Sequence, residues 1–232
     1  MEVSIILPKL FPRQQEIVDH PARFKVLACG RRFGKTRIAV HLLMKKLLSG
    51  QKVAYFAPSY RMASEVWREI KATLHSVMTY FSEKDFYLTL LTGGELEIWS
   101  GSDGGDLARG RKYHYAVIDE AALIANENMW NAVIRPLLVD YKGGALFAST
   151  PRGLNWFYTL YGFGQDEIQT DWKSWRLPTV ENPYLDIREI EDAQRHTPQR
   201  TFAQEFEATF LRGHLKSLLC HTTPLPASGE RE

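Results

Sequence analysis

This sequence contains few cysteines, no long apolar run and almost no excess of charge of either sign. Only Cys29 and Cys220 occur among 232 residues, and they lie far apart in dissimilar contexts. We therefore expect two free thiols in a reducing compartment, not a disulfide framework. No uncharged apolar run approaches the ~18–20 residues that a membrane-spanning helix needs. Pro8, Lys9 and Arg13 interrupt the start of the chain and argue against a signal peptide. These absences predict a soluble cytoplasmic protein without a membrane partner.

The charge balance likewise carries no strong signal. The formal net charge is +2, so any contact with nucleic acid has to come from a local basic patch. Hydrophobic residues make up 44% and charged residues 24% of the chain, as is usual for a globular protein with a substantial core. No internal repeat is present.

The strongest local pattern runs from Phe24 to Thr36. It begins with a short apolar run that indicates a buried strand, turns through Gly30 and Gly34, and becomes a helix at Lys35. A strand, a glycine-containing turn, Gly-Lys-Thr and a helix are the parts of a phosphate-binding loop. The segment therefore predicts nucleotide binding.

In such a loop, backbone N–H groups at the helix N-terminus face the phosphates. Lys35 would reach the β- and γ-phosphates, and the Thr36 hydroxyl would ligate Mg²⁺. The strict pattern requires glycine at position 29, where this chain has Cys29, and the alternative is an ordinary helix start. The predicted nucleotide contacts of the loop are Gly30, Arg31, Arg32, Phe33, Gly34, Lys35 and Thr36.

Two glutamines precede the loop. Gln14 and Gln15 lie in a short predicted helix near Pro12. An amide both donates and accepts hydrogen bonds, which suits recognition of the adenine edge. The alternative is a solvated glutamine on a helix surface.

A second strong pattern is the apolar strand that ends in Asp119 and Glu120. Ligands of parallel sheets lie at the carboxyl ends of the strands, so both carboxylates should face the crevice that holds the phosphate loop. Asp119 would hold the Mg²⁺ shell and Glu120 would polarise the attacking water. The alternative is a helix start with acidic residues at its positive end.

A further strand over residues 145–148 ends in Ser149 and Thr150. Beside the acidic strand, these hydroxyls would sense the γ-phosphate or the water and pass that state onward. The alternative is a strand end with Ser and Thr as caps.

The remaining pattern predicts an α/β fold. Strands are expected over 52–58, 87–91, 95–100 and 172–177, and helices over 60–81, 129–141, 186–196 and 198–211. Phe202, Phe206 and Phe210 should share one face of the last helix. We expect a core over residues 1–178, a C-terminal helical subdomain or linker over 179–212, and a disordered tail over 213–232.

Several segments together resemble the ATPase domain of the large terminase subunit of tailed bacteriophages. They read Phe-Pro-Arg-Gln-Gln-Glu-Ile-Val, Ala-Cys-Gly-Arg-Arg-Phe-Gly-Lys-Thr, Leu-Ala-Arg-Gly before Val-Ile-Asp-Glu-Ala-Ala, Ala-Ser-Thr-Pro-Arg-Gly, Glu-Asn-Pro-Tyr and Phe-Ala-Gln-Glu-Phe. The likeness covers residues 8–211. It implies a P-loop NTPase fold of the ASCE type, with a mostly parallel central sheet flanked by helices.

The resemblance also implies a function. Such a subunit is a Mg²⁺-dependent ATPase that drives double-stranded DNA into a preformed capsid. It acts as a homo-oligomeric ring on the portal protein with a small terminase subunit; a monomer is the alternative for this chain in isolation.

Residue by residue, the resemblance assigns the adenine contact to Gln14, with Gln15 as the near alternative. Arg31, Lys35 and Thr36 become phosphate and Mg²⁺ contacts, Asp119 the metal-side acid and Glu120 the catalytic acid. Ser149 and Thr150 become the coupling segment. Arg109 matches an arginine that some members supply to a neighbouring subunit's ATP, and a loop arginine in solvent or on DNA is the alternative.

One activity is expected to be absent, and two alternative functions stay open. Family members usually continue into a nuclease domain where this chain stops, so we expect no nuclease activity. A helicase-like, DNA-dependent ATPase is the alternative within the fold, although the sequence reads Asp-Glu-Ala-Ala and shows no second motor lobe. A non-catalytic nucleotide- or DNA-binding module is the alternative from another class.

Overall fold

The structure is a computed structural model that describes residues 4–102 and 105–212. The tail expected over residues 213–232 lies outside the described residues. Within the described part, no helix is both long enough and apolar enough to cross a bilayer.

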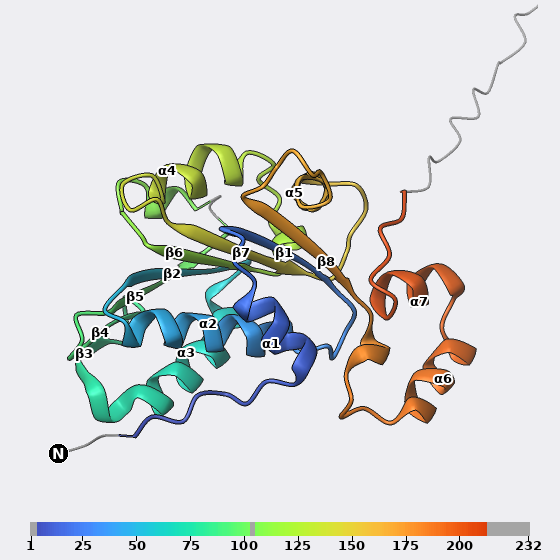
Figure 1. Cartoon of the computed structure of the whole chain (residues 1–232), viewed down its shortest axis with the longest axis horizontal. Coiled ribbons are helices and arrows are strands. Elements are labelled where there is room, and N and C mark those ends of the chain that lie inside the picture. Colours follow the sequence, from blue (N-terminus) through green and yellow to red (C-terminus); the bar gives the residue numbers. More distant parts are fainter. Residues whose placement is uncertain (1–3, 103–104, 213–232) are drawn as a thin grey trace, which may run out of the picture.

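One eight-stranded sheet forms the centre of the molecule, in the order β3-β4-β5-β2-β6-β7-β1-β8 (Figure 1). Six strands run parallel: β5 (Glu95–Ser100), β2 (Lys52–Ala57), β6 (Tyr115–Asp119), β7 (Gly144–Ser149), β1 (Phe24–Cys29) and β8 (Trp172–Leu177). The hairpin strands β3 (Met78–Ser82) and β4 (Tyr87–Leu90) extend one edge in antiparallel fashion. The predicted α/β fold with a mostly parallel sheet is confirmed.

Helices cover both faces of the sheet, as Figure 1 shows. One face carries α1 (Pro12–Asp19), α2 (Lys35–Leu48) and α3 (Tyr60–Leu74), and the other carries α4 (Arg135–Leu137) and α5 (Trp156–Phe163). All six residues of β1 are buried, because a parallel strand covered on both faces has no solvent side.

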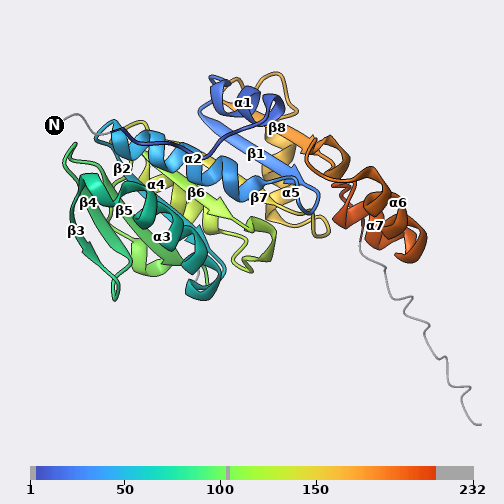
Figure 2. The ribbon, with the colours of Figure 1, turned by 90° about the horizontal axis from the view of Figure 1, so that it is seen from below.

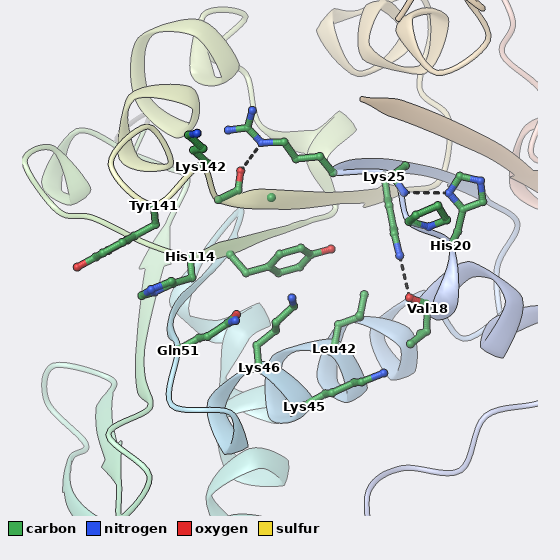
Figure 3. A pocket seen from close by; sticks show the side chains of 16 residues that line it. Val18, His20, Lys25, Leu42, Lys45, Lys46, Gln51, His114, Tyr141 and Lys142 are labelled. Atoms are coloured by element: carbon green, nitrogen blue, oxygen red, sulfur yellow. Dashed lines mark hydrogen bonds between the residues drawn. The ribbon is translucent and has the colours of Figure 1, made fainter. Parts of the chain in front are cut away.

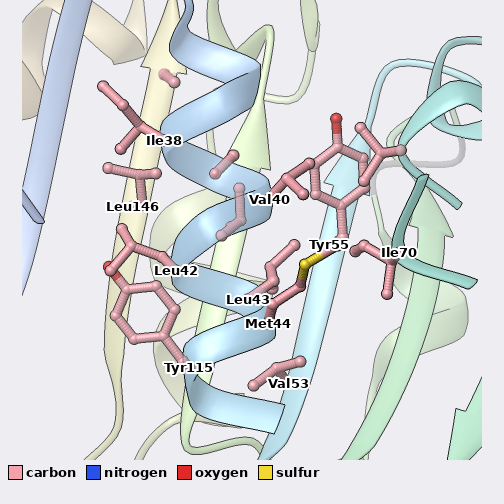
Figure 4. Packing of buried hydrophobic residues seen from close by; sticks show 14 of the residues in the cluster. Ile38, Val40, Leu42, Leu43, Met44, Val53, Tyr55, Ile70, Tyr115 and Leu146 are labelled. Carbon is pink, nitrogen blue, oxygen red and sulfur yellow. The ribbon is translucent and has the colours of Figure 1, made fainter. Parts of the chain in front are cut away.

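A separate hydrophobic cluster lies on each face of the sheet. Helix α2 is central to the first: Ile38 and Leu42 pack with Leu146 of β7, as Figure 4 shows. Their spacing of four residues places them on one side of the helix. Because Lys35 begins this buried helix, the phosphate loop is anchored to the core.

Helices α6 (Ile187–His196) and α7 (Gln199–Glu205) lie beyond the edge strand β8 in both views (Figures 1 and 2). The division into a core over 1–178 and a helical subdomain over 179–212 stays a prediction. The chain after β8 nevertheless contacts the phosphate loop: Gly30 N–H donates to the Leu177 carbonyl at 2.8 Å, and Arg31 N–H donates to the Glu205 carbonyl at 2.7 Å.

The predicted helix over 60–81 was too long. α3 ends at Leu74, a short 3₁₀ turn covers His75–Val77, and Met78 begins β3. The apolar spacing continues past Leu74, but residues 78–82 hydrogen-bond to β4, and their aromatic and hydroxyl side chains suit an exposed edge strand.

Two other helix predictions need similar corrections. Over 129–141 the chain forms a π-helix at Met129–Ile134 and one short turn of α-helix, where Pro136 lacks the N–H that would continue the α ladder. The helix predicted over 198–211 ends at Glu205. Phe202 stacks on Phe206 at 4.9 Å, but Phe210 packs 5.0 Å from Tyr161 of α5, so the three rings do not share a helix face.

Gly30 allows the C-terminal segment to lie against the phosphate loop. A Cβ atom at this position would overlap the Phe206 carbonyl and would meet Thr179 Oγ1 at 2.6 Å. We expect Gly30→Ala to lower the free energy of unfolding by ~1–3 kcal/mol, because the crowding is against backbone atoms. Urea denaturation measures the change.

The matched control is Gly162→Ala in α5, where a Cβ atom meets nothing within 4 Å. This change should raise the stability by ~0.5–1 kcal/mol, because alanine favours a helix more than glycine does. Equal stability of the Gly30→Ala variant and the unaltered chain would show that the C-terminal segment is not held against the loop.

Candidate nucleotide-binding site

The phosphate loop connects β1 to α2 and has two residues in the left-handed region of backbone conformation. Arg32 has φ +63° and Gly34 has φ +95°. The positive φ at position 34 favours glycine, and a Cβ atom there would lie 2.5 Å from Gln14 Nε2 and would displace that amide. The loop turns sharply and delivers Lys35 and Thr36 to the first turn of α2.

The Gln14 side chain is hydrogen-bonded to the backbone of this loop. Its side chain is buried, with 2% of its surface exposed, and its Nε2 donates to the Phe33 carbonyl at 3.1 Å. Its Oε1 accepts from the Phe11 N–H at 3.3 Å. Gln15 is exposed and donates to Asp19 at 2.8 Å. The amide of Gln14 is thus used to position the loop backbone, and contact of either glutamine with adenine stays a prediction.

Asp119 lies at the end of β6, next to the start of α2. Its Oδ2 accepts from the Tyr55 hydroxyl at 2.8 Å and from the Thr36 hydroxyl at 3.3 Å, and its Oδ1 accepts from the Glu120 N–H at 2.9 Å. Burial raises the pKa of Asp119, although Lys35 opposes that shift. A buried carboxylate of this kind gains most from a nearby cation.

Glu120 follows in a strained conformation, with φ +48°. Its Oε1 lies 2.8 Å from Lys35 Nζ, and its Oε2 lies 3.3 Å from the Ser149 hydroxyl. Burial lowers the pKa of Lys35, but attraction to Glu120 and Asp119 outweighs burial and leaves the pKa raised. Lys35 is therefore a cation at neutral pH. Left-handed residues other than glycine occur where surrounding contacts impose them, often at functional sites.

Two cavities meet at these residues. One, of about 440 Å³, is lined by Arg31, Arg32, Lys35, Glu120, Thr150 and Arg152, among others. The other, of about 360 Å³, is lined by Thr36, Tyr55, Arg61 and Asp119, among others. Glu120 lines both cavities. The carboxyl ends of β1, β6 and β7 thus bring together most of the residues predicted for the site.

The predicted arginines differ in position. Arg31 pairs with Glu205 of α7 at 2.6 Å, and Arg32 lines the larger cavity. Arg109 is exposed and pairs with Asp106 at 2.8 Å. It is not among the residues that line either cavity.

Several contacts were not foreseen from the sequence. Thr179 donates to the Arg31 carbonyl at 2.7 Å, and Asn182 donates to the Arg32 carbonyl at 2.6 Å. Tyr55 supports Asp119, and Arg152 lines the larger cavity. Only Asn182 and Arg152 lay in segments that the family resemblance had singled out, and no local pattern marks the other two residues.

The donor set suits a hard cation such as Mg²⁺. Thr36 and Asp119 offer a hydroxyl and a carboxylate oxygen 3.3 Å apart, and Mg²⁺ prefers oxygen ligands from one or two side chains, phosphates and water. Within residues 4–102 and 105–212, no group of three or more His, Cys, Asp or Glu side chains is arranged to hold a metal. Other ligands would have to come from phosphate and water.

The two roles of Gln14 can be separated by substitution. If Gln14 positions the loop, Gln14→Ala should cost ~1–3 kcal/mol of stability, because it leaves buried backbone groups unpaired. It should also weaken binding of ATP and GTP by the same factor. Denaturation and calorimetric titration measure both effects.

Gln15→Ala is the control and should change stability by less than ~0.5 kcal/mol, because the side chain is exposed. A loss confined to ATP in the Gln14→Ala variant would instead support the adenine contact.

Comparison with known proteins identifies the family. Residues 26–210 match the family described as terminase large subunit, T4likevirus-type, N-terminal. The large terminase subunit of Escherichia phage T5 is 35% identical over 197 residues, which are 83% of this chain and 45% of that protein. The chain therefore spans less than half the length of this relative.

Solved structures share the fold. The large terminase ATPase domain of Thermus phage P74-26 superposes with a TM-score of 0.76 at 23% identity, over 88% of this chain and 94% of that chain. The large terminase of a thermophilic bacteriophage, solved in complex with ADP, has a TM-score of 0.72 at 17% identity, over 86% of this chain and 53% of that chain. On the match over residues 26–210, this chain belongs to the family of N-terminal domains of T4-type terminase large subunits.

Proposed function

We propose that this chain is a Mg²⁺-dependent ATPase that powers the movement of double-stranded DNA into a viral procapsid. The observation that carries the proposal is the Lys35–Glu120 contact of 2.8 Å beside the Thr36–Asp119 pair. A phosphate-binding lysine, a metal-side acid and a second acid at one sheet edge are the parts that phosphoryl transfer from a nucleotide needs.

Each side chain has a distinct role in this proposal. The loop N–H groups and Lys35 bind the β- and γ-phosphates of ATP. Thr36 and Asp119 would hold Mg²⁺, which would neutralise phosphate charge. Phosphates compete with Glu120 for the Lys35 ammonium group, and this competition releases the carboxylate. Glu120 then orients the attacking water and accepts its proton, while the Ser149 hydroxyl fixes the position of the carboxylate.

Ser149 and Thr150 are suited to couple this chemistry to the rest of the domain. The Ser149 hydroxyl lies 3.3 Å from Glu120 and 3.0 Å from the Thr150 carbonyl. A few residues on, Asn155 caps α5 and donates to the Ala122 carbonyl at 3.0 Å. A change at Glu120 therefore has two short routes to α5: through Ser149 and the chain that follows it, and through Ala122 and its hydrogen bond to Asn155.

The partners of the motor are proposed from the family. They are double-stranded DNA, a portal protein, a small terminase subunit and further copies of this chain in a ring, in the host cytoplasm. The exposed Arg109 is suited to reach a neighbouring copy, because an arginine that completes a site in trans must project from its own subunit. Arg152, which lines the chain's own cavity, is the competing source of this positive charge.

The first test is Glu120→Gln. The amide keeps the size of the side chain but cannot accept the proton, so kcat for ATP hydrolysis should fall by ~10²–10⁴-fold. ATP binding should persist or tighten, because the phosphates no longer have to compete with a charged carboxylate for the Lys35 ammonium group. Steady-state hydrolysis and equilibrium titration measure the two quantities.

Glu127→Gln provides the control, since Glu127 is exposed and lines neither cavity of the site. Turnover that survives in the Glu120→Gln variant would remove Glu120 from the catalytic role. Binding of ATP without turnover in the unaltered chain would favour a non-catalytic binding module.

Arg109 is tested by mixing variants. Arg109→Ala should lower specific activity at least ~10-fold at high protein concentration, because an arginine in trans is worth far more than that in complete motors. Addition of Lys35→Ala chains, which are inactive but carry Arg109, should restore part of the activity. No restoration, or a larger loss in Arg152→Ala alone, would place the arginine within the same chain.

A further inference from the structure

A separate cavity lies at the opposite edge of the sheet, where β1, β6 and β7 begin. Its volume is about 380 Å³, and Figure 3 shows its lining side chains. Lys46 of α2 lines it, eleven residues after Lys35, which corresponds to roughly 16 Å along the helix. The amino-edge cavity is therefore distinct from the nucleotide-binding site, although α2 contributes to both.

The lysine and arginine side chains that line the amino-edge cavity are not balanced by acidic ones. Arg23, Lys25, Lys45, Lys46 and Lys142 line it, and no aspartate or glutamate does. Two carboxylates lie near the cavity: Asp171 is 3.8 Å from Arg23, and Asp19 is 3.9 Å from Lys45. Within the described part of the chain, Lys25, Lys46 and Lys142 have no ion-pair partner in this cavity.

Burial, together with the neighbouring basic groups, lowers the pKa of two of these lysines. Lys25 is 5% exposed, and its ammonium group donates to the Ile17 and Val18 carbonyls at 2.8 Å each. Burial and then Lys46 lower the pKa of Lys25 to about 8, against the opposing effect of Asp19. Burial and then Lys45 lower the pKa of Lys46. A bound anion would stabilise the protonated form of both lysines.

One unsatisfied hydrogen-bond donor indicates an anion in the same place. Among the described residues, two buried side-chain polar atoms lack a partner: the Tyr115 hydroxyl and Gln51 Oε1. Both residues line the amino-edge cavity. Tyr115 is 6% exposed, and burial raises the pKa of its hydroxyl, so this group is a protonated donor at neutral pH. Buried polar groups in proteins nearly always have a partner. The Tyr115 hydroxyl can donate to an acceptor such as a phosphate oxygen, whereas Gln51 Oε1 needs a donor such as water or a lysine.

The histidines of the cavity add further donors. The Nδ1 atom of His114 accepts from the Lys52 N–H, and that of His20 accepts from the Ala22 N–H, each at 3.1 Å. The neutral rings therefore carry their protons on Nε2. His114 also stacks on Tyr141 at 3.8 Å, so two aromatic rings line the cavity together with the basic side chains. Cations beside aromatic rings are typical of nucleic-acid contacts.

We propose that the amino-edge cavity is a second phosphate-binding site, with Tyr115, Lys46 and Lys142 as its principal contacts. The phosphate belongs either to the backbone of a nucleic-acid strand or to a free polyphosphate. The site goes beyond the proposed ATPase activity and does not depend on it, since none of these residues lies at the nucleotide-binding site.

Two variants each remove one of the three proposed contacts with little cost to the fold. Tyr115→Phe deletes only a hydroxyl that has no partner, so its melting temperature should be unchanged or raised. Lys46→Gln removes a charge that has no ion-pair partner among the described residues, together with its contact over the Tyr115 ring at 5.4 Å. Lys84→Gln is the control, because Lys84 is exposed and does not line this cavity.

The probes are pyrophosphate, titrated by calorimetry, and a labelled 20-base-pair duplex of mixed sequence, titrated at several salt concentrations. All proteins carry Lys35→Met, which weakens phosphate binding at the nucleotide site. Tyr115→Phe and Lys46→Gln should each weaken binding by about tenfold, as loss of a hydrogen bond to a charged group does. Lys46→Gln should also reduce the salt dependence of duplex binding by about one phosphate contact.

The outcomes distinguish the two sources of phosphate and test whether the site exists. Weaker binding of the duplex alone assigns the cavity to a nucleic-acid backbone, and weaker binding of pyrophosphate alone assigns it to a free polyphosphate. Weaker binding of both supports a site for either source. If both variants bind both probes as Lys84→Gln does, the cavity holds only water and the proposal is wrong. Basal ATP hydrolysis, measured with Lys35 restored, should be unchanged in every case.

Discussion

The contact between Lys35 and Glu120 depends on three parallel strands that end at one edge of the sheet. β1 leads into the loop that carries Lys35, β6 ends just before Glu120, and β7 between them ends in Ser149. Burying a cation and an acid costs desolvation free energy, which their attraction at 2.8 Å offsets only if both side chains are held in position. The close packing of α2 against the sheet holds both side chains in position. The geometry of the site therefore depends on the whole core.

The phosphate loop is also held from two sides by segments distant in the sequence. Gln14 of α1 donates to the Phe33 carbonyl, and Thr179 and Asn182, from beyond β8, donate to the carbonyls of the two loop arginines. The carbonyls of the loop thus have partners in segments that lie before and after it in the sequence. Movement of the C-terminal helices would be transmitted to Arg31 directly, because Glu205 of α7 pairs with its side chain.

Helix α2 connects two cavities of different character. Its first residue, Lys35, contacts an acid, whereas Lys46 in its last turn lies among other basic groups. Basic residues in the last turn of a helix are favoured by the helix dipole, and this explains why lysines occur there. The dipole does not account for the unpartnered Tyr115 hydroxyl, and this hydroxyl makes the cavity more than a cationic helix end.

Local signals in the sequence predict several elements of this fold. The strand before Gly30, the turn to Lys35 and the acidic end of β6 each follow from apolar periods and from residue types that only a few conformations accept. Adjacency at one sheet edge followed from the rule for parallel strands. Other features arise only from packing across the fold: the strand β3, the early end of α7, the Gln14 contact to Phe33 and the amino-edge cavity. Each depends on residues brought together across the fold, such as Lys25 with Lys46 and Gly30 with Phe206, and no local pattern records such pairs.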